Sequence, residues 1–193
     1  MPLPFGHSLM GYALHDSLQQ DKREWSWKTV LLFVVVANLP DIDFLPGFLM
    51  GKPNLYHHHY LSHSLGFAVF VGLVLGWFFA KRKPRGFLYY FLVFGSVCYS
   101  HMVLDYFTAD TSTPLGLPLF WPFSAEYRYS EFSIFLAVHK SGDSATFFQS
   151  LFTQHNFWVA LWEVVVFVPV LAVIKLVKNR KKLLVRLADD KSY

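Results

Sequence analysis

The chain has few cysteines and few charged residues, and both shortages narrow its class. Its 193 residues include a single cysteine, Cys98, which excludes an internal disulfide and a cysteine-rich zinc finger. Charged residues make up 16% of the chain, against roughly a quarter in soluble domains. The net charge of +4 comes from basic residues beside apolar segments, not from a basic stripe, so no nucleic acid partner is expected.

Apolar and aromatic residues are correspondingly abundant. Hydrophobic residues make up 54% of the chain and aromatic residues 19%, with 21 Phe and 6 Trp. This composition is typical of a helical protein that faces lipid and anchors its rings at the membrane interfaces. We therefore predict an all-α fold, a polytopic membrane helix bundle that forms one domain over residues 1–193.

Several apolar segments approach the ~20 residues that are needed to cross the hydrocarbon core. Residues 64–80, 86–104 and 157–174 are the clearest. Residues 29–39 are short, and they cross only if their helix begins near residue 25 and continues toward residue 50. Residues 3–19 either span the membrane or lie flat on its inner surface. We favour the spanning arrangement, and the sequence predicts four to five crossings.

Basic residues set the predicted orientation. The loop at residues 81–85 is short and basic, which places it in the cytoplasm. Residues 22–28 and the basic tail at residues 175–193 fall on the same side. A loop at about residues 109–155 then lies outside, and the tail is a possible site for a cytoplasmic protein partner.

Histidines and aspartates gather at the outer ends of these segments. Ionisable groups at membrane depth cost several kcal/mol each, so they point to function. Neutral imidazoles mixed with carboxylates are ligands that Zn²⁺ and similar cations take. The sequence predicts a metal site near the outer face, from His7, Asp41, Asp43, His58, His59, His63, His101 and Asp105.

Each of these groups also has a plainer interpretation. His101 and Asp105 are four apart and share a helix face, but a hydrogen-bonded histidine without a metal explains the pair as well. Asp41 and Asp43 flank Ile42 in a turn that can bring both carboxylates together, or Asp41 can cap the next helix in a solvated loop.

The histidine run leaves the choice of ligand open. His59 and His63 are four apart and align if a helix begins early, whereas His58 aligns with His63 only if the chain is extended there. His57 is a bystander or a supporting residue in either case. A solvated loop is the plainer alternative for the whole run.

The order of these motifs resembles the membrane-bound metal-dependent hydrolase family of bacterial inner membranes. One member of that family is described as an inner-membrane protein that binds the SOS repressor. The resemblance covers roughly residues 1–135. It rests on His7, Leu39-Pro40-Asp41-Ile42-Asp43, His58-His59-Tyr60-Leu61-Ser62-His63-Ser64-Leu65, His101-Met102-Val103-Leu104-Asp105-Tyr106-Phe107-Thr108 and Gly116-Leu117-Pro118-Leu119-Phe120-Trp121-Pro122-Phe123.

That family is in turn similar to zinc-dependent phospholipase C, a helical enzyme with a His-x-x-x-Asp pair. The resemblance implies that His101 and Asp105 are ligands and that Asp105 is able to bridge two metals. An aspartate of the Pro-Asp-Ile-Asp turn and His63 would complete one site, and His7 would belong to a second.

The family's His-Arg-x-x-Thr-His pattern places its first histidine at His58. His59 then stands in place of the arginine and Ser62 in place of the threonine. A phosphate-binding arginine is therefore missing from the motif, and Arg128 in the outer loop is a candidate to replace its charge. Glu163, inside the last span, is a further but less favoured candidate ligand.

The sequence therefore predicts a multi-pass inner-membrane hydrolase with one or two divalent ions, zinc being preferred. Its substrate would be a phosphoester or lipid-like ester at the membrane, attacked by a metal-activated water at an extracytoplasmic site. His63, His101, Asp105 and one of Asp41 or Asp43 would hold the ion, and the other aspartate would act as base or support.

Two other classes remain. One is a non-catalytic membrane protein with a structural metal and a partner-binding tail. The other, a cation transporter, is disfavoured because the polar residues gather near one side of the membrane.

Overall fold

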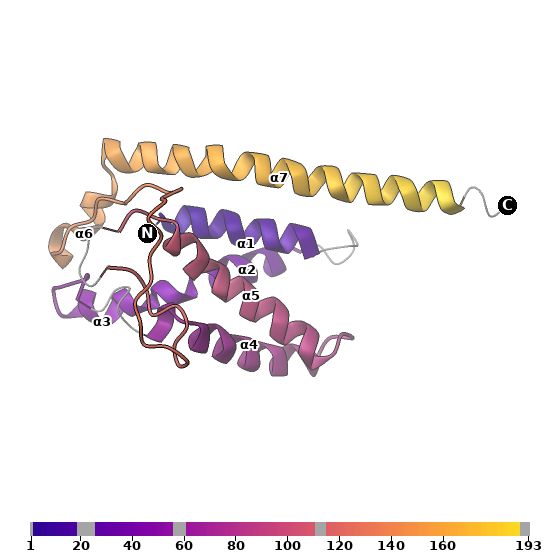
Figure 1. Cartoon of the computed structure of the whole chain (residues 1–193), viewed down its shortest axis with the longest axis horizontal. Coiled ribbons are helices and arrows are strands. Elements are labelled where there is room, and N and C mark those ends of the chain that lie inside the picture. Colours follow the sequence, from indigo (N-terminus) through magenta and orange to yellow (C-terminus); the bar gives the residue numbers. More distant parts are fainter. Residues whose placement is uncertain (1, 19–25, 56–60, 111–114, 190–193) are drawn as a thin grey trace.

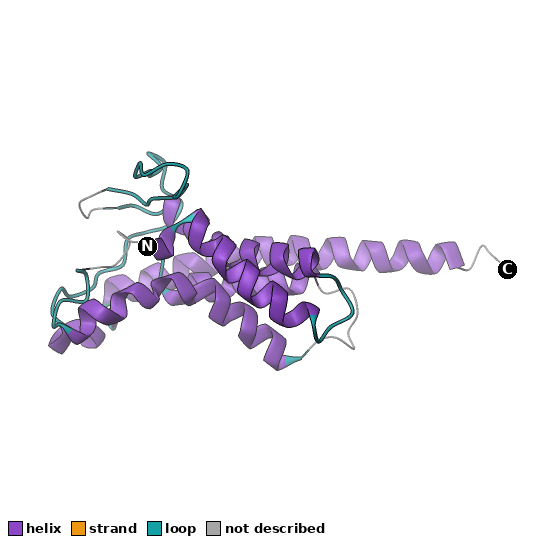
Figure 2. Cartoon of the chain, turned by 90° about the horizontal axis from the view of Figure 1, so that it is seen from below, coloured by secondary structure: helices purple, strands orange, loops and turns teal. Residues whose placement is uncertain are grey.

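Helices make up most of the described chain, and a long irregular segment separates α5 (Phe87–Tyr106) from α6 (Ser144–Leu151). The computed structural model describes residues 2–18, 26–55, 61–110 and 115–189, giving the backbone alone for residues 181–189. Figures 1 and 2 show helices joined by loops. In order these are α1 (Pro4–Leu18), α2 (Trp27–Asn38), η2 (Leu39–Asp43), α3 (Phe44–Leu49), η3 (Leu61–His63), α4 (Leu65–Ala80), α5 (Phe87–Tyr106), α6 (Ser144–Leu151) and α7 (Gln154–Asp189).

Three of the described helical segments are long and apolar enough to cross a membrane. They cover Trp27–Leu49, Phe87–Tyr106 and Gln154–Arg180. The first confirms that residues 29–39 belong to a longer apolar stretch, which runs on through η2 and α3. The other two confirm the segments expected at residues 86–104 and 157–174. Helix α4 is apolar but has only 16 residues, fewer than the ~20 needed for a perpendicular crossing.

Local sequence explains where these helices begin and change. Ser26 caps α2 by accepting a hydrogen bond from the Lys28 backbone N–H, and Ser64 caps α4 by accepting one from Phe67. Pro40 follows α2 at a position where it removes a backbone donor, and the chain continues as the 3₁₀ turn η2. That turn carries Asp41 and Asp43.

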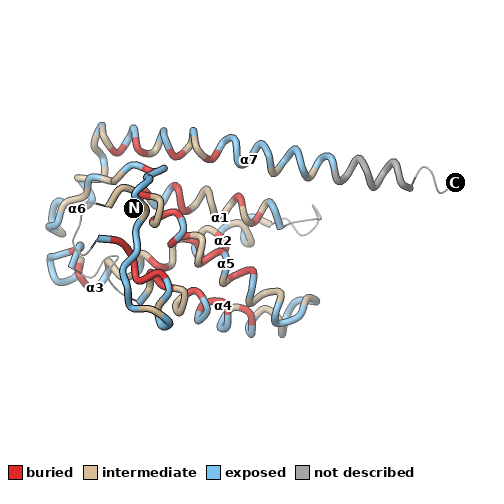
Figure 3. The backbone as a smooth tube through the Cα atoms, viewed as in Figure 1, coloured by how far each residue is buried: buried red, intermediate tan, exposed pale blue. Residues whose placement is uncertain are grey.

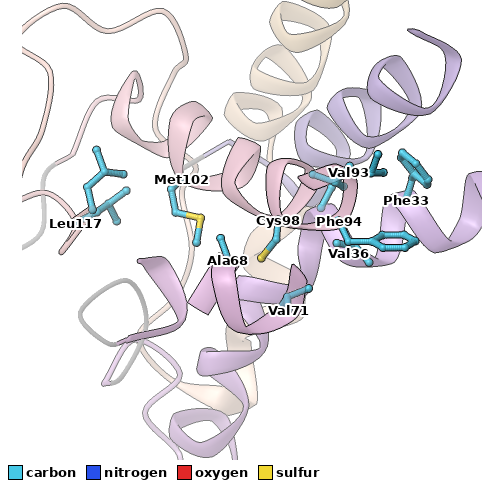
Figure 4. Close-up of a cluster of buried hydrophobic side chains, with 12 residues drawn as sticks. Phe33, Val36, Ala68, Val71, Val93, Phe94, Cys98, Met102 and Leu117 are labelled. Atoms are coloured by element: carbon cyan, nitrogen blue, oxygen red, sulfur yellow. The ribbon is translucent and has the colours of Figure 1, made fainter. Parts of the chain in front are cut away.

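The core lies where α2, α4 and α5 meet. Figure 4 shows Phe33 and Val36 of α2 close to Phe94 and Cys98 of α5, with Ala68 of α4 beside them. Small residues allow this approach. A Cβ added at Gly72 would lie 2.8 Å from the Phe91 carbonyl oxygen, and one at Gly76 would lie 2.9 Å from the Phe91 nitrogen. Close backbone contact through small residues is typical of helices packed in a membrane.

Helices α1 and α7 lie side by side and run in the same direction. Near their beginnings, Glu163 of α7 accepts a 2.6 Å hydrogen bond from the Leu3 backbone N–H. Near the far end of α1, Lys178 of α7 donates to the Asp16 carboxylate at 2.6 Å. Helix α7 continues well beyond the rest of the bundle toward the C-terminus (Figure 1).

The outward faces of the long helices are apolar. In Figure 3 exposed segments run along the outer side of α7 while buried segments face α1. Val165, Val168 and Val173 of α7 are more than half exposed, as is Phe70 of α4. Faces of this kind suit contact with lipid better than contact with water.

The helix directions show which segments lie together at each end of the bundle. Contacts between α2 and α5 pair Phe33 with Phe94 and Ala37 with His101, so these helices are parallel. The contact of His15 with Thr29 makes α1 and α2 antiparallel. The basic loop after α4 therefore shares an end with the start of α2, and the histidine and aspartate segments meet at the other end.

Candidate metal centre

Four helical elements bring six of the predicted side chains together. His7 comes from α1, Asp41 and Asp43 from η2, His63 from η3, and His101 and Asp105 from α5. The three histidines have no exposed surface, and Asp105 is 6% exposed. Two groups have ligand atoms within 4.8 Å of one another: Asp41 with His63 and His101, and His7 with His101 and Asp105.

Four atoms form the tightest part of this cluster. His63 Nε2 lies 3.3 Å from His101 Nε2, 3.6 Å from Asp41 Oδ1 and 3.5 Å from Asp105 Oδ2. His101 Nε2 lies 3.5 Å from Asp41 Oδ1 and 3.2 Å from Asp105 Oδ2. We call these four atoms the four-donor set.

The spacings around the two imidazole nitrogens of the four-donor set fit a small divalent cation. Ligand atoms at the corners of a tetrahedron, each about 2.0–2.1 Å from a central ion, are about 3.3–3.4 Å apart. The five distances given above run from 3.2 to 3.6 Å. Two imidazole nitrogens and two carboxylate oxygens are also a ligand combination that such ions take.

The outer nitrogens of both rings are held by other groups, which orients the inner ones. His101 Nδ1 donates to the Ala37 carbonyl oxygen at 2.8 Å, and His63 Nδ1 lies 3.0 Å from Asp43 Oδ2. We assign the ring protons to these two nitrogens. Nε2 of each ring then faces the shared centre, the arrangement that metal-binding histidines adopt.

Asp43 lies behind His63 and outside the four-donor set. Its Oδ2 accepts a 2.9 Å hydrogen bond from the Ser62 hydroxyl in addition to its contact with His63. Asp41 and Asp43, which the sequence could not tell apart, therefore occupy different positions. Asp41 is directed to the centre, and Asp43 is directed to the imidazole that faces it.

His7 belongs to the second group, on the other side of Asp105. Its ring stacks on His101 with centroids 3.7 Å apart and an interplanar angle of 14°. Its Nε2 lies 3.5 Å from Asp105 Oδ1, whereas Asp105 Oδ2 faces His63 and His101. The carboxylate thus presents one oxygen to each group. Because His101 Nδ1 is occupied, the two groups share its single remaining nitrogen.

Two groups near the centre that lie outside the candidate spans have shifted pKa values. Burial by itself lowers the pKa of His63, but Asp41 and Asp43 outweigh burial and raise it above its usual value. A cation at Nε2 therefore competes with a proton. Burial lowers the pKa of the Lys140 ammonium, while the nearby carboxylates of Asp41 and Asp105 oppose that shift.

Other predicted residues are not brought to the centre, or lie outside the described part of the chain. His57, His58 and His59 lie outside the described residues. Arg128 is exposed, paired with Glu126 and placed over the Phe120 ring. The less favoured ligand Glu163 accepts from Leu3 at the start of α1 instead. His139 and His155 belong to neither donor group, and their rings stack on each other with centroids 3.7 Å apart.

Sequence reasoning missed two supporting groups. Lys140, in the segment before α6, supplies a positive charge near the carboxylates of the centre. Its signal in the sequence was weak, a single cation in a long loop. The Ala37 carbonyl, which orients His101, gave no signal, since any residue at that position carries one.

The model of a protein family matches residues 1–181 of the chain. The chain belongs to the YdjM inner membrane protein family. Searches of curated proteins and of solved structures give no significant match. The YdjM family confirms the part of the expected resemblance that concerns a bacterial inner-membrane protein family, and with the three apolar helices it supports an inner-membrane location. The family description names a membrane location and no reaction.

Proposed function

We propose that this protein is a membrane-embedded, divalent-metal-dependent hydrolase that cleaves a phosphoester or a lipid-like ester. The four-donor set is the observation that carries the proposal. Two imidazole nitrogens lie 3.3 Å apart at a buried point, and each of them lies 3.2–3.6 Å from a carboxylate oxygen of Asp41 and of Asp105. Bringing two carboxylates and two inward-facing imidazoles together is unfavourable unless a cation or protons compensate their charge and lone pairs.

Zinc is the ion that the proposal favours, because the donors are imidazole nitrogens and carboxylate oxygens, and the spacings at the nitrogens match those around a small tetrahedral ion. A divalent ion held there would lower the pKa of a coordinated water to roughly 7 and so supply hydroxide as nucleophile. His63, His101, Asp41 and Asp105 would hold it. Because the two groups share one nitrogen of His101, a second ion would depend on His7 and on Asp105 Oδ1.

Charge near the centre supports an anionic substrate. Asp43 would hold His63 in place, as carboxylates behind metal-binding histidines do. Asp41 is the outermost of the carboxylates facing the centre, with 13% of its side chain exposed, and is suited to accept a proton from the attacking water. Lys140 would neutralise charge on a phosphoryl oxygen.

The proposed topology has five crossings, formed by α1, the Trp27–Leu49 segment, α4, α5 and α7. Helix α1 lies along both α2 and α7, which supports a spanning position for it. The basic loop after α4 and the basic tail of α7 would face the cytoplasm. The metal centre, at the opposite end, would face outward.

One observation favours a second function, a structural metal site in a non-catalytic protein with a partner-binding tail. Four protein donors complete a tetrahedral shell, and closed shells are typical of structural sites, whereas catalytic sites keep a position open. His7 and Lys140 argue for catalysis, because a site that only braces helices does not need ionisable groups beyond its ligands and the groups that orient them. The number of protein and water ligands around a bound ion distinguishes the two functions, because only a catalytic site keeps a position for water.

The experiment begins with the metal content of the purified protein and of its His101→Ala and Asp105→Ala variants. His139→Ala is the matched control, because His139 lies outside the donor groups. The proposal expects a full complement of metal in the wild type and control and much less in the other two. Cobalt substitution then reports coordination, and a chromogenic phosphodiester reports turnover. A closed four-coordinate ion without turnover would establish the structural alternative.

A further inference from the structure

Exposed apolar side chains cover two short helices at the same end of the molecule as the metal centre. Helices α3 and α6 lie together there (Figure 1). Leu49 is 78% exposed, Met50 63%, Phe148 57% and Phe152 89%. We call these four residues the α3–α6 patch. Neither helix contains an ionised residue, and the nearest exposed ones in sequence are Lys52, after α3, and Asp143, which caps α6.

The patch is held in a defined arrangement. Phe44 of α3 stacks on Phe147 of α6 with centroids 5.8 Å apart, and Phe48 meets Phe148 edge to face at 5.4 Å. The Ser144 hydroxyl donates a 2.6 Å hydrogen bond to the Phe48 carbonyl oxygen. Segments almost a hundred residues apart in sequence are thus joined, and their remaining apolar side chains point outward.

Chain connections join the patch to two candidate spans and to residues near the metal centre. Helix α3 is the end of the candidate span Trp27–Leu49, and α6 comes shortly before the candidate span Gln154–Arg180. The patch therefore continues the apolar surface of two membrane helices. Asp43, beside His63, directly precedes α3, and Lys140 comes four residues before α6.

We infer that the α3–α6 patch lies among the acyl chains of the leaflet on the metal-centre side and admits substrate sideways from the membrane. Apolar helices in this position bind through the area they bury at the headgroup boundary. The inferred substrate is accordingly a membrane phospholipid, whose phosphoester reaches the centre while its chains remain in the bilayer. The substrate part of this inference rests on the proposed function, and the membrane contact does not.

Membrane depth tests the contact directly. Cys98 is buried, so Phe148→Cys and Phe152→Cys each give one accessible thiol for an environment-sensitive fluorophore. In vesicles of phosphatidylglycerol and phosphatidylethanolamine, spin-labelled acyl chains should quench both positions. The exposed control Glu126→Cys should stay unquenched. Water-like emission at Phe148 and Phe152, or blue-shifted emission that lipid spin labels do not quench, would overturn the inference, the latter by indicating a protein contact.

Kinetics test the route of the substrate. Replacing Phe148 and Phe152 together by Ser should lower the rate on vesicle phospholipid, relative to the rate on a soluble chromogenic diester, by roughly tenfold. Equal changes in the two rates would contradict entry from the membrane. If the wild type hydrolyses neither substrate, the proposed function fails, whereas the quenching result still decides whether the patch contacts lipid.

Discussion

The two ends of the bundle hold their ionisable side chains in different environments. At the end with the candidate metal centre, the imidazoles and the Asp105 carboxylate are buried and directed at a common point. At the other end two neighbouring cations lie over aromatic rings: Lys81 is 3.7 Å from the Trp77 centroid and Arg82 is 3.8 Å from that of Phe78. The first arrangement suits binding of an ion, and the second suits anchoring at a membrane surface.

This contrast shows why polarity alone does not identify a site in a membrane protein. Trp77 is 58% exposed and Phe78 41%, so the pairs at the basic end keep access to their surroundings. His101 has no exposed surface and cannot reach solvent, so only its neighbours can compensate its polarity. Substitutions at the two ends should therefore differ sharply in their effect on metal binding.

Removing one of the proposed metal ligands should have the largest effect on metal affinity. His101→Ala deletes a nitrogen that both metal groups share, so we expect metal affinity to fall by more than the roughly 10–100-fold that supporting residues contribute. A competition titration with a zinc-selective chelator measures this loss. Unchanged affinity would remove His101 from the ligand set.

Changing a supporting carboxylate should have a smaller effect at the same end. Asp43→Asn keeps an oxygen near His63 but weakens its hold on the ring, and we expect a loss of about 10–100-fold in metal affinity. The same titration applies. A loss as large as that of His101→Ala would show that Asp43 itself binds the ion.

The contact between α1 and α7 should affect stability. Glu163→Ala leaves the Leu3 N–H without its acceptor, at a cost of about 1–3 kcal/mol in the free energy of unfolding. Glu163→Gln retains an acceptor oxygen and should lose less. Thermal unfolding in detergent distinguishes them, and equal melting temperatures for both variants and wild type would show that this hydrogen bond does not secure α1.

The destabilisation caused by an alanine between α4 and α5 should depend on the space around the glycine that it replaces. Gly72→Ala places a Cβ 2.8 Å from the Phe91 carbonyl oxygen, so it should destabilise the bundle by about 1–3 kcal/mol. Gly95→Ala is the matched control, because its nearest contact would be an ordinary 3.5 Å. Thermal unfolding measures both, and similar destabilisation by the two variants would contradict the packing described.

A substitution at the basic end should have the smallest effect. Lys81→Ala removes a cation over an exposed ring, which is worth roughly 0.5–1 kcal/mol. Metal content and chelator competition should remain those of the wild type. A change in metal affinity would show that the two ends are coupled, which the separation described above does not predict.

Much of this arrangement could be predicted from sequence, because it follows from periodicity and hydropathy. Apolar length located the segments around α5 and α7, and the four-residue spacing placed His101 and Asp105 on one helix face. Basic residues predicted that His63 and this pair lie at one depth. The structure brings them within 3.5 Å of one another.

The remaining details depend on geometry that no local pattern encodes. Asp41 and Asp43 are two residues apart, and only the path of the 3₁₀ turn after Pro40 decides which one faces the centre. Lys140 reaches the carboxylates through an irregular segment. The bond between Glu163 and Leu3 joins residues 160 positions apart, and a hydropathy pattern shows Glu163 only as an isolated charge.

X-ray absorption on the metal-loaded protein tests the four-donor set most directly. We predict a first shell of nitrogen and oxygen at about 2.0–2.1 Å, with outer-shell scattering from the imidazoles of His63 and His101. The imidazole signal should fall in whatever metal His101→Ala retains. A shell of oxygen alone, or an identical spectrum in the variant, would contradict the account.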